Sequence, residues 1–173
     1  RYANLPISGF PILSNEGAML LNKKIGVIYG KGGYGKSLLV GKLCDDLALE
    51  GHKVARLQLE DELELHLLRS LAQQSGNAGV AKPEWHNLNP NESKEIYAEH
   101  KETLQKLSKT IVSGEDAEWT AEKILDWMEY QLKAGKSLII VDPVSVVLTK
   151  DIWITTHRLV WGTKRLLAQY PQG

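Results

Sequence analysis

The pattern of apolar and polar positions predicts strands and helices in alternating order. An apolar run from Lys24 to Tyr29 predicts a first strand, and helical spacing follows from about Lys36 to Glu50, where Gly51 takes the C-terminal capping position. Val54 to Leu59 alternates apolar with polar side chains, which is typical of a half-buried strand parallel to the first. The first part of the chain therefore predicts a strand–helix–strand unit.

The second part continues this order. A short strand is expected near Thr110 to Val112, and Ser137 to Val147 is a continuous apolar run of the kind found in central parallel strands buried on both faces. Helical spacing predicts four further helices, at Leu63 to Ala72, Asn89 to about Ser108, Thr120 to about Ala134, and Thr156 to Gln169. The fold class expected is α/β, with three αβα layers around a central, mainly parallel sheet.

Composition bounds the class of protein. The chain has 173 residues, 43 % of them hydrophobic and 24 % charged, which fits one domain over 23–173 after an irregular lead-in over 1–22. Lys plus Arg and Asp plus Glu both number 21, so only a local basic surface could attract nucleic acid. Apolar runs stay below the ~20 residues of a membrane span, and no secretory signal opens the chain. The single cysteine, Cys44, is expected to be buried. A cytoplasmic protein with no membrane partner is expected.

A phosphate-binding motif lies between the first strand and the first helix. Gly30-Lys31-Gly32-Gly33-Tyr34-Gly35-Lys36-Ser37 matches G-x-x-x-x-G-K-[ST], and Leu38 continues into the helix. Glycines let backbone N–H groups turn inward as an anion nest, to which the helix adds the positive end of its dipole. Lys36 would reach the β- and γ-phosphates, and the Ser37 hydroxyl would hold Mg²⁺. Residues 30 to 38 are therefore predicted to bind a nucleoside triphosphate.

Two acidic positions complete the predicted site. Asp142 ends the apolar stretch Leu138-Ile139-Ile140-Val141, and an acid at the carboxyl end of a parallel strand can reach the Mg²⁺ shell. Glu60 follows the second strand and is the best candidate for activating water, with Asp61 and Glu62 as rivals. The spacing does not fix the roles within this triplet, which also suits the N-terminus of a helix.

These motifs resemble the RecA-like ATPase core of hexameric replicative helicases, most closely the plasmid replication (RepA) and DnaB-like type. The resemblance spans about Ile25 to Ser145. It rests on Gly32 to Ser37 followed by Leu38-Leu39-Val40, on Leu57-Gln58-Leu59-Glu60-Asp61 before a helix with His66, Leu68 and Arg69, on Trp119-Thr120, and on Ile139-Ile140-Val141-Asp142-Pro143-Val144-Ser145. It implies ATP as the nucleotide, Glu60 as the catalytic carboxylate, Asp142 as the Mg²⁺-supporting acid, single-stranded DNA as a partner, and a hexameric ring.

The C-terminal part departs from this family. The family continues with a strand that carries a polar sensor and with an arginine finger, whereas here the chain stops after the helix Thr156 to Gln169. Lys150-Asp151 also joins the last strand directly to Trp153, where relatives have a mobile loop. The domain is therefore expected to be incomplete at its C-terminal end. The basic residues of the last helix could contact DNA or a neighbouring subunit, or form a solvated face; they are Arg158, Lys164 and Arg165.

A second resemblance competes with the first. Lys31 to Ser37 also fits K-G-G-x-G-K-[ST], the signature of partition and positioning ATPases resembling ParA and MinD. There, Lys31 would cross a dimer interface to the phosphates of the other subunit. Leu38, where that family usually has Thr, and the acidic segment Leu59-Glu60-Asp61 favour the helicase-like class. The histidines show no metal-ligand spacing, and His66 is expected on a helix surface.

Overall fold

The computed structural model describes residues 4–7, 9–11, 19–114, 117–147 and 151–170. The expectation of an α/β fold is confirmed, with three parallel strands in one small sheet and helices on both of its faces. The described elements, in chain order, are β1 (Leu5–Pro6), β2 (Met19–Leu20), α2 (Lys36–Leu49), β3 (Val54–Gln58), α3 (Leu63–Ser75), the 3₁₀ turn η1 (Ala78–Ala81), α4 (Pro83–Leu88), α5 (Pro90–Ser108), β4 (Ile111–Ser113), α6 (Ala121–Lys133), β5 (Leu138–Asp142), η2 (Val144–Val147) and α7 (Ile152–Gln169).

The sheet has the strand order β4-β3-β5, and both strand pairs are parallel. Arg56 is level with Ile111 on one side and with Ile140 on the other, so β3 is the central strand. A separate antiparallel pair, β1 and β2, lies within the predicted lead-in. No helix in the described part of the chain has the length and apolar character that a membrane crossing requires.

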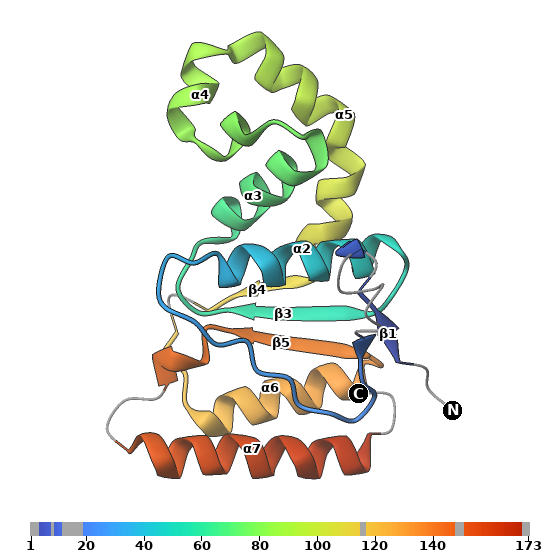
Figure 1. Cartoon of the computed structure of the whole chain (residues 1–173), viewed down its shortest axis with the longest axis vertical. Helices are drawn as coiled ribbons and strands as arrows, with labels where there is room; N and C mark the ends of the chain where they lie inside the picture. The colour runs from blue at the N-terminus through green and yellow to red at the C-terminus, as the bar shows by residue number, and fades with distance from the viewer. Residues whose placement is uncertain (1–3, 8, 12–18, 115–116, 148–150, 171–173) are drawn as a thin grey trace.

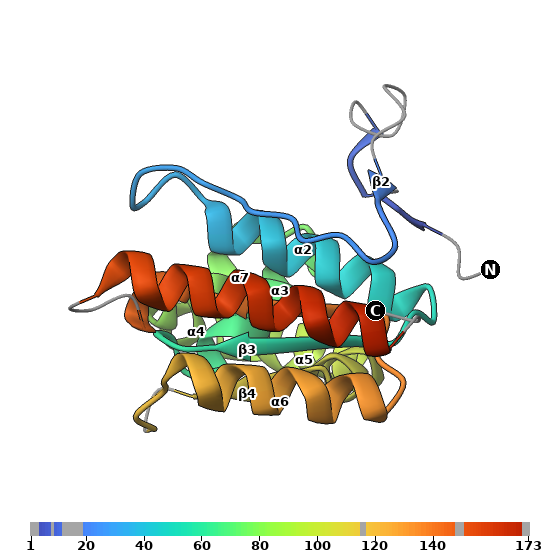
Figure 2. The same cartoon turned by 90° about the horizontal axis from the view of Figure 1, so that it is seen from below.

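Two apolar clusters hold helices against opposite faces of the sheet. Val54 packs with one face of α2, whereas Leu57 packs with α6 and α7, because successive strand residues point to opposite sides. Figure 2 shows α2 and α6 on either side of the sheet. The first cluster is Val40, Leu43, Cys44, Leu47 and Val54, and the second is Leu57, Leu59, Ala121, Ile124, Val147 and Leu159. The burial predicted for Cys44 is confirmed, with none of the residue exposed.

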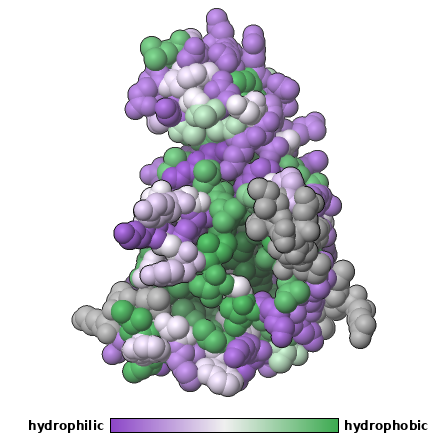
Figure 3. Space-filling view, in the orientation of Figure 1, coloured by the Kyte–Doolittle hydropathy of each residue, from purple (hydrophilic) through white to green (hydrophobic). Residues whose placement is uncertain are grey.

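Helices α3, α4 and α5 form an arm that extends away from the sheet (Figure 1). The helix expected to end near Ser108 is confirmed as α5, whereas η1 and α4 occupy a region for which no helix was expected. His86 ties the arm together, since its ring nitrogens lie 2.7 Å from the Val80 carbonyl and 2.8 Å from the Ser93 hydroxyl. In the view of Figure 3 the far end of the arm is mostly hydrophilic, and apolar residues gather over the middle of the molecule.

The predicted first strand is wrong for the described structure. Residues 24–29 form no strand, and Val27 and Tyr29 are 83 % and 97 % exposed. A strand needs a hydrogen-bonded neighbour, and β5 ends the three-stranded sheet on the side away from β3. The segment runs in the same direction as β5 in Figure 1 without pairing with it. Apolar character alone therefore did not decide strand formation here.

Other boundaries also shift. The last predicted strand, Ser137 to Val147, is confirmed only as β5, because η2 turns the chain after Asp142. Helix α7 begins at Ile152, before the expected Thr156, while the loop position Lys150 lies outside the described residues. The cap expected at Thr120 is confirmed, since its hydroxyl accepts the backbone N–H of Lys123 at 3.3 Å.

Candidate functional site: a phosphate loop and two strand ends

The glycine-rich loop curls around the ammonium group of Lys36. This group donates to the carbonyl oxygens of Gly30 and Lys31, both at 2.9 Å. Gly33 and Gly35 have φ angles of 77° and 78°, in the left-handed region that residues with a Cβ rarely adopt. The loop thus turns through two positions that favour glycine, and two of its carbonyl oxygens accept from one cation.

Helix α2 starts at the end of this loop. Its N-cap is Gly35, which offers no side-chain cap, and its first turn contains no acidic residue. The positive end of the helix dipole is therefore not neutralised by a side chain of that turn, and an anion is the complementary ligand. Ser37 is half-buried, while Leu38 is 49 % exposed. Lys31 and Tyr34 are exposed along the same loop, as are Gly32 and Gly33.

Asp142 is held at the carboxyl end of β5. The residue is 8 % exposed, and its Oδ2 atom is buried without a hydrogen-bond partner. Its backbone carbonyl accepts the N–H of Leu59 at 2.9 Å, which fixes the strand end against the chain leaving β3. A buried carboxylate oxygen without a donor fits a cation as its ligand. Asp142 is thus a suitable donor for Mg²⁺.

The acidic triplet is divided by its contacts. Asp61 accepts a hydrogen bond from Arg69 at 2.7 Å, and its Oδ2 atom also lies 3.9 Å from Nε2 of His66. Glu60 and Glu62 are exposed instead. Asp61 therefore contacts side chains of α3. Of the two exposed acids, Glu60 is the one closer in sequence to the end of β3.

The loop and the two strand ends lie at the same end of the molecule. In Figures 1 and 2 the turn before α2 and the carboxyl ends of β3 and β5 occupy one side. Parallel strands place their carboxyl ends along one edge. Glu60 comes two residues after β3, and Asp142 is the last residue of the neighbouring strand β5. The loop and the two strand ends thus share one end of the molecule.

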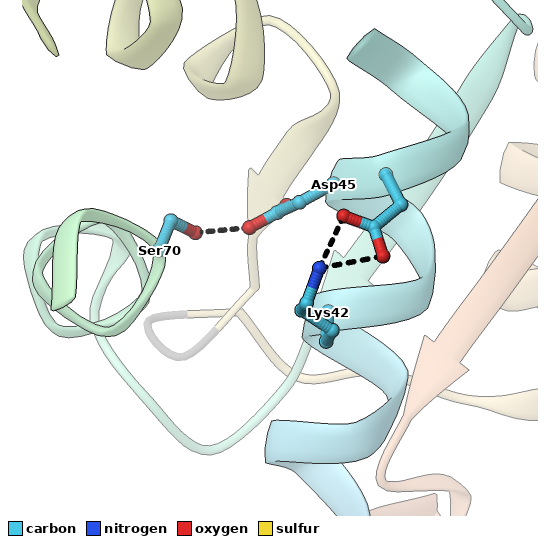
Figure 4. Close-up of polar contacts among 4 residues, drawn as sticks. Lys42, Asp45 and Ser70 are labelled. Carbon is cyan, nitrogen blue, oxygen red and sulfur yellow. Dashed lines mark hydrogen bonds and ion pairs between the residues drawn. The ribbon is translucent and has the colours of Figure 1, made fainter. Parts of the chain in front are cut away.

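A buried polar cluster lies beside the site and was not predicted. Its members are Asp45 on α2, Arg56 on β3, and His66 and Ser70 on α3, each at most 3 % exposed. Ser70 donates its hydroxyl to Asp45 at 2.5 Å, as Figure 4 shows. Nη2 of Arg56 lies 3.8 Å from Oδ1 of the same carboxylate. An ion pair inside the protein thus joins the first helix to the central strand.

Burial dominates the protonation of this cluster. It raises the pKa of Asp45, against the opposing effects of the Ser70 hydrogen bond and the Arg56 charge. Burial, reinforced by the Arg56 charge, lowers the pKa of His66 to about 4, so the imidazole is neutral at pH 7. Burial likewise raises the pKa of Cys44 to about 12.

A cavity of about 10 Å³ lies within the cluster, which is room for roughly one water molecule. Its wall joins the first turns of α2, through Ser37 and Gly41, to α3, through Arg69 and Gln73. A Cβ added at Gly41 would lie 3.1 Å from Nη1 of Arg56, so the glycine leaves space for the guanidinium. Ser37, at the end of the glycine-rich loop, therefore shares a cavity wall with α3, the helix that follows Glu60.

Two sequence interpretations are wrong at this cluster. His66 is buried rather than on a helix surface, and β3 is buried at all five positions rather than half-buried. Arg56 and Gln58 produced the alternating pattern, yet Arg56 faces the Asp45 carboxylate and Gln58 is 2 % exposed. An arginine is read as a solvent-facing position unless its buried counter-charge, far away in sequence, is known. Periodicity carries no signal for that pairing.

Within the described residues, no group of three or more His, Cys, Asp or Glu side chains gathers in a way that could hold a metal ion. A Mg²⁺ ion at this site would draw its ligands from Ser37, Asp142, phosphate oxygens and water. No family model, curated protein or solved structure matches this chain.

Proposed function

We propose that this protein binds Mg²⁺-ATP and hydrolyses it, as the core of a three-layer, RecA-like P-loop ATPase. The observation that supports this most is the loop wrapped around Lys36, at the same end of the molecule as the ends of β3 and β5. The match of Gly30 to Ser37 to the phosphate-loop motif supplies the ligand class. Together they support a polyphosphate as the ligand.

The roles follow from the contacts. Lys36 would exchange its two carbonyl acceptors for phosphate oxygens, while the N–H groups of Gly33 and Gly35 and the start of α2 complete the cradle. Ser37 and Asp142 would hold Mg²⁺, which neutralises developing charge on the phosphates when bound. Glu60 is exposed at the strand edge and would accept a proton from the attacking water.

A helicase-like motor acting on single-stranded DNA, assembled as a hexamer, is the class we favour. It is supported by the order of the motifs and by the segment from Leu57 to Asp61, which leads from the buried strand β3 into α3. The competing class, a partition-like ATPase dimer, draws support from the exposed position of Lys31 on the loop. The exposed Lys31 side chain would be available to a second subunit.

The deciding experiment measures steady-state ATP hydrolysis with and without single-stranded DNA, together with the mass in solution with ATP. We expect turnover that single strands stimulate, a six-subunit mass, and loss of ATP binding and turnover in Lys36→Ala. Lys31→Ala should keep its activity. An ATP-dependent dimer that loses activity in Lys31→Ala would replace the helicase-like class with the partition-like one. Absence of ATP binding by the unsubstituted protein would end the proposal.

A further inference from the structure

Helix α7 exposes two tryptophan side chains to solvent. Trp153 is 87 % exposed and Trp161 is 54 % exposed. They are eight positions apart in the sequence, which corresponds to about 12 Å along a helix and to a rotation of about 80° around its axis. Helix α7 packs on α6 through its other side, where Leu159 is buried and Gly162 faces Leu125. The two indoles therefore lie on the outer side of the molecule.

Positive charge accompanies these rings. Nζ of Lys164 lies 4.9 Å from the centre of the Trp161 ring, and the His157 ring lies 5.9 Å from it. Arg165 is exposed beside them, while Arg158 is bound to Glu122 of α6. The whole helix, Ile152–Gln169, contains no aspartate or glutamate, although the chain as a whole is neutral. This surface is therefore a local basic and aromatic patch.

We propose that this face of α7, made by Trp153, His157, Trp161, Lys164 and Arg165, binds single-stranded nucleic acid. Unpaired bases present π faces that stack on indole rings, and their phosphates are attracted to cations placed between those rings. Duplex bases are stacked on each other and cannot use exposed tryptophans in this way. A protein interface would also use tryptophan, but a helix with only basic charges favours a polyanion.

The inference deepens the proposed function by naming the surface that binds the single-stranded nucleic acid. It rests on that function only where strand binding is expected to stimulate ATP hydrolysis. Binding to α7 needs no nucleotide, so it can be measured separately. If the unsubstituted protein binds single-stranded nucleic acid but does not hydrolyse ATP, the proposed ATPase function is wrong. If it hydrolyses ATP but does not bind single-stranded nucleic acid, the proposed binding surface on α7 is wrong.

The test is fluorescence anisotropy of labelled oligo-dT, oligo-U and a duplex of equal length, each measured at several salt concentrations. The two single strands distinguish DNA from RNA. We expect both Trp153→Ala and Trp161→Ala to weaken single-strand binding about tenfold. The double variant Lys164→Gln with Arg165→Gln should make the plot of log K against log salt less steep, by about 0.7 for each lost phosphate contact.

Matched controls lie on the arm. Leu88→Ala removes an apolar residue that is 80 % exposed, and Lys101→Gln removes an exposed lysine of α5. Both should bind like the unsubstituted protein. The glutamine pair tests the proposal even where a tryptophan variant fails to fold. Equal binding by the α7 variants and these controls would overturn it, and so would α7 variants that change the mass in solution while their strand binding stays intact, which marks a protein interface.

Discussion

Gln58 and Asp142 are paired across the parallel strands β3 and β5. The two strands therefore end level with each other, and the acidic segment after β3 begins beside the end of β5. The Leu59 N–H bound to the Asp142 carbonyl continues this pairing by one residue. The candidate carboxylates, Glu60 and Asp142, are far apart in sequence but lie at the ends of two neighbouring strands.

The first prediction separates the acids of the triplet. Glu60→Gln should keep ATP binding and lose turnover by at least about a hundredfold, because it removes only the group that accepts a proton. Glu62→Gln is the matched control, since Glu62 is also exposed and adjoins the same turn. Single-turnover hydrolysis and nucleotide titration measure the two effects. Full turnover in Glu60→Gln would contradict the role assigned to Glu60.

The second prediction concerns Asp142. Asp142→Asn should raise the Mg²⁺ concentration needed for ATP binding, because it removes the charge from the buried Oδ2 atom. Nucleotide binding without Mg²⁺ should change little, which isothermal titration with and without the ion can establish. An unchanged Mg²⁺ requirement would exclude Asp142 from the ion's shell.

The third prediction concerns the buried ion pair. Asp45→Asn leaves the guanidinium of Arg56 without its counter-charge and should lower the free energy of unfolding by about 3–5 kcal/mol. The double variant Asp45→Asn with Arg56→Met should be more stable than Asp45→Asn alone, since the uncompensated charge is gone. Urea unfolding of the two single variants and the double variant measures this coupling. Simple additivity would show that the pair does not interact.

The fourth prediction is an acid-dependent loss of stability through His66. Its pKa of about 4 in the folded protein lies below the 6.5 of an unfolded chain. The unfolded state therefore binds the proton more tightly, and the stability present above pH 6.5 is lost as the pH falls toward 4. The full loss is about 3 kcal/mol for a difference of this size.

The charged groups facing His66 are Arg56, Asp61 and Arg69. The two arginines lower its pKa, and Asp61 raises it. Asp45, with its raised pKa, acts in the opposite direction, because the folded protein then takes up a proton more readily. His66→Gln should flatten the pH dependence between 4 and 6.5, as urea unfolding at a series of pH values can show. His100→Gln, on the half-buried side of α5, is the control and should keep the slope.

The fifth prediction concerns Cys44, which is fully buried and whose pKa is about 12. The thiol should resist alkylation at pH 8 in the folded protein and react at once in denaturant, because only the thiolate is nucleophilic. Mass spectrometry after timed exposure to iodoacetamide measures the modified fraction. Rapid modification of the native protein would place Cys44 near the surface.

The sequence by itself determined the glycine-rich turn before α2, most helices, the parallel strands after it and the burial of Cys44, because spacing and turn chemistry act over a few residues. Tertiary structure alone decided three matters. Residues 24–29 lack a strand partner, so their apolar pattern forms no strand. Arg56 is buried where the Asp45 carboxylate of α2 faces it, and burial together with the Arg56 charge keeps His66 neutral. Such pairings depend on contacts between residues far apart in sequence, whereas local periodicity reflects only neighbouring residues.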